Sequence, residues 1–188
     1  VIKTDRLEDQ STNRLADLVP NSLHVNIGEV MTAVNNHAKF TNKMKHFTNR
    51  YVPGRPSPET LIATTIALGC SVGLSKMNKI SKNLSGDLEQ VATLYFSNEN
   101  LQNANDVVLK MIGDLPISKI YGDPSESHTS SDGGKYNVHI HTIDTSKSFK
   151  YHMSGHGISV YVFVDQSHRM FYSTVINSSE REAAYVID

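Results

Sequence analysis

Two patterns of hydrophobic and polar residues divide the chain near Pro116. Before this residue the apolar positions recur at helical spacing, and after it they alternate or cluster as they do in β-strands. We therefore expect residues 1–115 to form a mostly helical region and residues 116–188 to begin a β-rich domain. The fold class that follows is α+β.

Two helices are predicted with particular detail. Over residues 58–70, Ser57 supplies an N-cap, Pro58 takes the first helical position and Glu59 favours the helix dipole. Over residues 39–51, apolar residues share one stripe and basic residues share the neighbouring one. The apolar stripe consists of Phe40, Met44, Phe47 and Tyr51, and the basic stripe of Lys39, Lys43, His46 and Arg50.

Three further helical segments complete this region. In "GLSKMNKISKNLSG" the apolar residues are expected to face inward and the lysines outward, until Gly86 interrupts the helix. The inward residues are Leu74, Met77, Ile80 and Leu84. "DLEQVATLYFS" and "NENLQNANDVVLKMIGDLP" follow, the second capped by Asn98 or Asn100.

Three strands are predicted after Pro116, preceded by one short β-prone segment. "ISKIYGD" is short and β-prone, "KYNVHIHTI" alternates, and "GISVYVFVD" and "RMFYSTVI" are rich in β-branched and aromatic residues. The link "DQSH" has the length of a hairpin turn. A helix capped by Ser178 or Ser179 is expected to follow, which gives the order β-β-β-α.

Composition is that of a folded, soluble protein. The 188 residues are 38% hydrophobic, and no apolar stretch approaches the ~20 residues of a membrane span. Cys70 has no partner for an internal disulfide, and the N-terminus does not resemble a signal peptide. A cytoplasmic protein is expected. Because the chain lacks a first methionine and stops inside a predicted helix, we also expect it to be a fragment of a longer protein.

Positive charge is concentrated in one part of the chain. The net charge is −1, yet residues 30–86 carry eight Lys or Arg and one acidic residue, Glu59. Such an uneven field attracts phosphate, although a solvated helix face has the same composition. The candidate DNA-contacting residues are Lys39, Lys43, Arg50, Lys76, Lys79 and Lys82.

Nine histidines raise the possibility of a transition-metal site. His139 and His141 would lie on one face of a strand, with His128, His152 and His156 near in sequence. Imidazoles bind such metals, but exposed strand positions also collect polar residues. A histidine-ligated metal enzyme is therefore one hypothesis.

Carboxylates suggest a second hypothesis, metal-dependent phosphoryl transfer. Asp132 lies between two serines and two glycines at the start of a predicted strand, and Asp165 ends the next long strand. Oxygen ligands of this kind suit Mg²⁺. Both aspartates equally fit ordinary turns. A third hypothesis is a DNA-binding module without catalysis, in which basic helices contact phosphates and the strands are scaffold.

Six sequence blocks resemble the Tn-three family of replicative bacterial transposases. They are "PETLIATTIALGCSVGLSKM", "ENLQNANDVVL", "LPISKIYGD", "SSDGGKY", "GHGISVYVFVDQ" and "REAAYVID", in the order and approximate spacing of that family. The resemblance spans roughly residues 15–188. It departs from the family in the longer linker "PSESHT" and in the histidines of "HIH".

The resemblance implies a ribonuclease-H-like catalytic core of the aspartate-aspartate-glutamate type after a helical region. Asp132 would then be catalytic as the first ligand of Mg²⁺ or Mn²⁺, with the glycines allowing a tight turn at the mouth of the strand. The other two acids would fall beyond Asp188. Asp188 itself is expected to be structural, and Asp165, which matches the "DQ" at the end of a strand in the family, is not expected to be catalytic. Implied partners are double-stranded DNA and a second copy of the protein, in a bacterial, nucleoid-associated setting. Residues 1–188 alone are expected to be inactive, and an inactive transposon relic or non-catalytic DNA-binding module remains the alternative.

Overall fold

The computed structural model describes residues 25–48, 54–81, 87–120, 128–139, 142–147, 149 and 155–185. The chain divides into two compact units, which are described separately below. Residues 1–36 and 54–92 form the first unit, and residues 37–53 and 93–188 form the second. The boundary predicted between residues 115 and 116 stays a prediction. Within the described part, no helix has the length and apolar character needed to cross a membrane.

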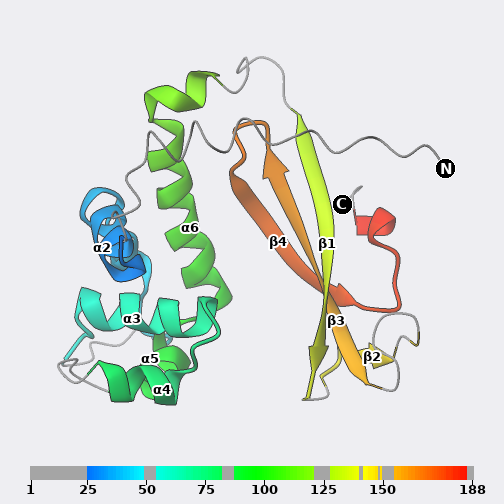
Figure 1. The fold of residues 1–188 in the computed structure, drawn as a ribbon, viewed down its shortest axis with the longest axis horizontal. Helices are drawn as coiled ribbons and strands as arrows, with labels where there is room; N and C mark the ends of the chain where they lie inside the picture. Colours follow the sequence, from blue (N-terminus) through cyan, green and yellow to red (C-terminus); the bar gives the residue numbers. More distant parts are fainter. Residues whose placement is uncertain are drawn as a thin grey trace, which may run out of the picture. The chain divides into compact units, whose positions relative to one another are not determined.

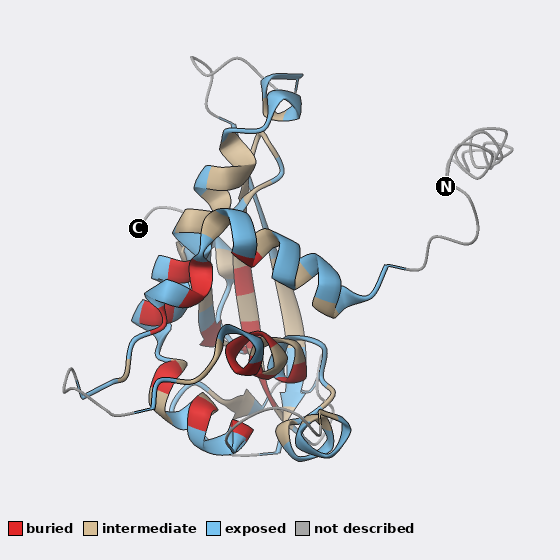
Figure 2. Ribbon diagram, turned by 90° about the vertical axis from the view of Figure 1, so that its left-hand side faces the viewer, coloured by how far each residue is buried: buried red, intermediate tan, exposed pale blue. Residues whose placement is uncertain are grey.

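Helices make up the described part of the first unit (Figure 1). They are α2 (Ile27–Ala38), α3 (Pro58–Gly69), α4 (Leu74–Ile80) and α5 (Leu88–Tyr95), of which α2 and α5 end in the second unit. The prediction for α3 is confirmed, since the Ser57 hydroxyl accepts a hydrogen bond from the Thr60 N–H at 3.2 Å. This bond satisfies one of the free N–H groups of the first turn. Helix α3 also carries five buried residues, coloured red in Figure 2.

Helix α4 has fewer buried contacts than its sequence predicts. None of its residues is fully buried, and Ile80, expected to face inward, is 64% exposed. The helix ends at Ile80 and Ser81 follows in a non-helical conformation. Leu84, the last residue of the predicted stripe, lies outside the described residues.

The predicted helix over residues 39–51 is wrong. Helix α2 ends at Ala38, and Lys39 takes a left-handed conformation with φ 54°, which turns the chain out of the helix. Only a 3-10 helix, η1 (Phe40–Lys43), follows, and Met44 is extended. Phe40 and Met44 are buried as expected, but Phe47 is 63% exposed. Two apolar residues therefore reach the core without a continuous helix.

Helix α6 (Asn98–Gly113) is the longest helix described. Its N-cap is Ser97, whose hydroxyl accepts from the Asn100 N–H, and neither Asn98 nor Asn100 caps it as predicted. Asn100 is instead buried, and its amide donates to the carbonyls of Lys45 (2.6 Å) and Tyr95 (2.8 Å). One side chain thus joins the start of α6 to the end of α5 and to the segment after η1.

The second unit also contains an antiparallel sheet (Figure 1). Its strands are β1 (Thr129–Val138), β2 (Ser146–Lys147), β3 (His156–Asp165) and β4 (Met170–Asn177). Strand β3 is central, because it pairs with β1 along one edge and with β4 along the other. The short β2 pairs with the first two residues of β3, where β4 pairing stops. The β3–β4 hairpin predicted at "DQSH" is confirmed.

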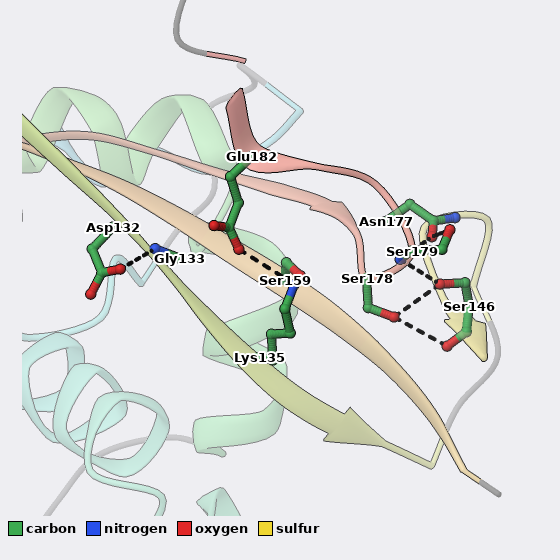
Figure 3. A network of polar contacts seen from close by, with 9 residues as sticks. All are labelled: Asp132, Gly133, Lys135, Ser146, Ser159, Asn177, Ser178, Ser179 and Glu182. Carbon is green, nitrogen blue, oxygen red and sulfur yellow. Dashed lines mark hydrogen bonds and ion pairs between the residues drawn. The ribbon is translucent and has the colours of Figure 1, made fainter. Parts of the chain in front are cut away.

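Two predictions at the ends of the sheet are wrong. The β-prone segment after Leu115 begins as a 3-10 helix, η2 (Pro116–Ile120). After β4 the described chain forms another 3-10 helix, η3 (Glu182–Tyr185), in place of the capped α-helix. Its predicted caps bond elsewhere: the Ser178 hydroxyl shares a hydrogen bond with the Ser146 hydroxyl on β2, and the Ser179 hydroxyl donates to the Asn177 side-chain oxygen (Figure 3). Both capping hydroxyls are thus engaged in other hydrogen bonds.

The two faces of the sheet differ in burial. In an antiparallel sheet, paired residues share a face and successive residues alternate. One face carries Gly133, Lys135, Tyr161, Ser159 and Ile176, and the last three are buried. The other face carries Asp132 opposite Val162, and Val175, which is 48% exposed. The more open face is therefore the one that bears the candidate ligand.

Candidate metal-binding carboxylate on strand β1

Asp132 lies within β1 and not in a turn before it. It is the fourth residue of the strand and pairs with Val162 of β3. The glycines that follow, Gly133 and Gly134, continue the strand, and neither has a positive φ. The predicted tight turn at this position is wrong. The alternation of "KYNVHIHTI" indicated a strand, but pairing with β3 extends it back through the "SSDGG" motif.

The carboxylate of Asp132 is accessible. The side chain is exposed, and one of its oxygens accepts a hydrogen bond from the Gly133 N–H at 2.9 Å. An exposed carboxylate on a paired strand is a suitable oxygen ligand for a hard cation such as Mg²⁺. Asp132 would supply one ligand only: among the residues described, no three His, Cys, Asp or Glu side chains gather where they could hold a metal. The donor chemistry fits, and further ligands would have to come from outside these ranges.

Asp165 does not join Asp132. Its position on β3 is three residues beyond Val162, the partner of Asp132, which places it about 10 Å along the strand and on the opposite face. Its carboxylate instead binds Arg169 through an ion pair of 2.7 Å and accepts from the N–H groups of Ser167 and Arg169. Burial raises the pKa of Asp165, but these bonds and the charge of Arg169 lower it further, so the pKa lies below its usual value. Asp165 is a turn residue, as one of the two interpretations predicted.

The described histidines do not form the predicted metal cluster. His128 and His139 flank the two ends of β1, and so lie about 35 Å apart. His156 begins β3, paired with Val138. Since the described ranges hold no group of three possible ligands, a histidine site made from these three residues is excluded. His141 and His152 fall outside those ranges, as does Asp188.

The basic candidates are divided between the two units. Lys76 and Lys79 lie exposed on α4 in the first unit. Lys39, in its left-handed conformation, and Lys43, at the end of η1, lie exposed in the second. The helical basic stripe expected for Lys39 and Lys43 is therefore wrong, although both remain accessible to solvent. Arg50 and Lys82 are outside the described part of the chain.

Several polar residues behind Asp132 were not predicted. The residues on either side of it in β1, Ser131 and Gly133, point to the opposite face. Ser131 shares a part-buried hydrogen bond of 2.7 Å with the hydroxyl of Tyr161, a residue that is itself buried. Glu182 of η3 lies over Gly133 and forms an ion pair of 3.3 Å with Lys135 (Figure 3). The sequence signal for this contact was Gly133, because a glycine inside a strand often marks the place where another group approaches closely.

Comparison with known proteins identifies a family for most of the chain. The family model described as "Tn3 transposase DDE domain" matches residues 29–188. The chain is 25% identical over 178 residues to the "Transposase for transposon gamma-delta" of Escherichia coli K12, which is 94% of this chain and 17% of that protein. It is 24% identical over 153 residues to the "Transposase for transposon Tn1546" of Enterococcus faecium, which is 81% of this chain and 15% of that protein. The chain thus spans about a sixth of the length of these relatives.

Proposed function

Because the chain belongs to the Tn3 transposase DDE domain family, we propose that it forms part of the catalytic region of a DNA transposase. The reaction proposed is hydrolysis of a phosphodiester at each transposon end, followed by joining of the freed 3′-hydroxyl to target DNA. At the family level this is phosphoryl transfer, a reaction that depends on positioning and charge stabilisation more than on covalent catalysis by the protein. Residues 1–188 alone are proposed to be inactive.

The position of Asp132 carries this proposal. It lies in the "SSDG" motif, on a strand paired along its whole length, with its carboxylate exposed on the more open face of the sheet. The antiparallel order β1-β3-β4 and the preceding helices agree with the first part of a ribonuclease-H-like fold. Asp132 is proposed to be the first of the three acidic ligands that the resemblance implies.

Asp132 is proposed to hold Mg²⁺ or Mn²⁺ together with acids outside the described residues. When bound, such ions stabilise negative charge on the attacking and leaving oxygens of a phosphodiester. The contribution of this chain is to present one carboxylate oxygen at a fixed point of the sheet. Pairing with Val162 fixes the strand, and the Gly133 N–H holds the other oxygen of the carboxylate.

Double-stranded DNA is the proposed partner, in a complex that contains two copies of the protein, one for each transposon end. Six basic residues are proposed to contact phosphates, on the strength of the charge pattern. Four of them, Lys39, Lys43, Lys76 and Lys79, are exposed, and Arg50 and Lys82 lie outside the described residues. Contacts of this kind supply affinity without reading sequence. A cytoplasmic, nucleoid-associated location is part of the proposal.

Substitution of Asp132 tests the function directly. In the full-length transposase that contains this chain, Asp132→Ala should reduce cleavage of transposon-end DNA to background in Mg²⁺ and in Mn²⁺, because a metal ligand is lost. Binding of the same DNA should stay within twofold of the unmodified protein. Asp144→Ala is the matched control, since Asp144 is an exposed acid in the same unit.

The two outcomes separate catalysis from binding alone. Cleavage by the Asp132→Ala protein at the normal rate would refute the role of Asp132 and favour the non-catalytic DNA-binding module. That module would instead lose DNA binding when Lys76 and Lys79 are reversed in charge. Mn²⁺-dependent nicking by residues 1–188 alone would refute the proposed inactivity of this segment.

A further inference from the structure

We propose that Glu182, Lys135 and Ser159 form a clamp that positions Asp132 from the opposite face of the sheet. In this arrangement Glu182 is a positioning residue for the metal-binding carboxylate and does not itself contact metal or DNA. The inference rests on the proposed function, because it assigns a role to these residues in the same site. Glu182 lies over Gly133, the residue that directly follows Asp132 in β1.

Gly133 leaves the space in which the Glu182 carboxylate lies. A Cβ atom added at Gly133 would overlap that carboxylate, and its closest neighbours are all atoms of Glu182. The φ of Gly133 is not in the left-handed region, so the backbone itself does not require glycine here. The absence of a side chain at residue 133 therefore allows η3 to approach β1 next to Asp132.

Lys135 and Ser159 fix the carboxylate in this position. The Lys135 ammonium lies 3.3 Å from the Glu182 carboxylate and donates to the Ser159 hydroxyl at 2.8 Å (Figure 3). Ser159 is fully buried on the central strand β3, and the side chains of Lys135 and Glu182 are 18% and 35% exposed. Removing one partner from a partly buried charge pair leaves the other charge uncompensated. The clamp thus joins η3, β1 and β3 through a chain of polar contacts.

Both residues that flank Asp132 are held from the same side. Ser131 is hydrogen-bonded to the Tyr161 hydroxyl, and Gly133 is covered by Glu182. Asp132 points to the other face, where neither contact obstructs a metal ion or a phosphate. Outer residues that orient a metal ligand in this way typically affect metal affinity or activity 10- to 100-fold when removed. The clamp is expected to act on Asp132 at the lower end of that range.

The test uses Glu182→Gln and Lys135→Met in the full-length transposase, with Lys147→Met as control for the loss of a lysine. Lys147 is exposed on β2 in the same unit. Glu182→Gln and Lys135→Met should each raise the Mg²⁺ concentration for half-maximal end cleavage about tenfold, with binding of end DNA unchanged. Hydrogen exchange of a peptide covering residues 129–138 should also become faster. A loss of folded protein would lower the amount of active enzyme without moving the metal requirement.

Gly133→Ala provides an independent variant, since it displaces the Glu182 carboxylate without removing it. Gly133→Ala should raise the Mg²⁺ requirement as much as Glu182→Ala does. The double variant Gly133→Ala with Glu182→Ala should raise it no further than either single change, because the added Cβ at residue 133 overlaps only the side chain of Glu182 that the second change removes. Exchanging the charges, with Lys135→Glu and Glu182→Lys together, should restore part of the metal affinity.

The outcomes distinguish this inference from the proposed function. If Asp132→Ala abolishes cleavage while Glu182→Gln and Lys135→Met keep the normal Mg²⁺ requirement, the clamp does not position Asp132 and the proposed function stands. The clamp is also refuted as a positioning device if hydrogen exchange of residues 129–138 becomes faster while the Mg²⁺ requirement stays the same. If Asp132→Ala still cleaves, the proposed function fails, and the clamp fails with it as a device for catalysis.

Discussion

At the scale of single residues, Asp165 shows how one carboxylate can fix a hairpin. It binds the Arg169 guanidinium at 2.7 Å and accepts two backbone N–H groups of the turn. Arg169 also lies against Gly113, the last residue of α6, where a positive charge is favourable to the helix dipole. The sequence left open whether Asp165 belongs to a metal site or to a turn. Its carboxylate oxygens both bind groups of the turn.

Asp165→Asn should destabilise the protein by about 1 kcal/mol at pH 7, because it removes a partly exposed ion pair. The folded pKa of Asp165 lies below its usual value, so the stabilisation is complete above the unfolded pKa of about 3.9. It is lost as the pH falls through the folded pKa. Urea unfolding of the unmodified protein and of Asp165→Asn should therefore give free energies of unfolding that differ less at pH 3.5 than at pH 7. Asp144→Asn is the control. An equal difference at both pH values would contradict the role of the ionised Asp165 carboxylate in stability.

At the scale of secondary-structure elements, Asn100 holds three segments of the second unit together. Its buried amide donates to two carbonyls that belong to the end of α5 and to the segment after η1. Asn100→Asp removes these donors and places a carboxylate against the same two carbonyl oxygens. We expect a loss of about 3 kcal/mol in the free energy of unfolding.

Asn103→Asp is the matched control for that prediction. Asn103 is an exposed residue on the same helix, and surface substitutions usually change stability by less than about 0.5 kcal/mol. Thermal unfolding of the two variants measures the difference. If both variants unfold at the same temperature, the Asn100 amide does not hold these segments.

The sequence predicted those elements whose local signals agree with their surroundings. Helix α3 has its Ser57 cap and Pro58 at the expected positions, and β3 forms where β-branched residues cluster. The helix at residues 39–51 failed because Lys39 leaves the helical conformation, which spacing alone does not reveal. Strand β1 was placed too late, since its pairing with β3 extends through residues of low β-propensity.

The candidate site was predicted only in part for the same reason. The motif made Asp132 a candidate ligand, which stays a prediction, but its place inside the strand depends on the register with Val162. Glu182 and Lys135 are 47 residues apart in the chain, and no periodicity connects them. Their contact requires η3 to fold back over β1, which only the tertiary structure shows.

At the scale of the whole molecule, the exposed lysines test whether the first unit takes part in DNA binding. Lys76 and Lys79 lie three residues apart on α4, so they are neighbours on one side of this helix. A phosphate contact releases counterions, and each one adds about 0.9 to the slope of log affinity against log salt. Two lost contacts should therefore reduce that slope by nearly 2.

Lys76→Glu with Lys79→Glu should weaken binding of the full-length transposase to end DNA and to unrelated DNA by similar factors, because phosphate contacts carry no sequence information. The loss should be largest at low salt, where charges are least screened. The same pair of changes at Lys110 and Lys119, which lie in the second unit, is the comparison for a general change in net charge. Equal losses from both pairs would mean that net charge, and not a surface on α4, determines the affinity. A loss confined to end DNA would instead place α4 in sequence recognition, which neither its composition nor its exposed lysines predict.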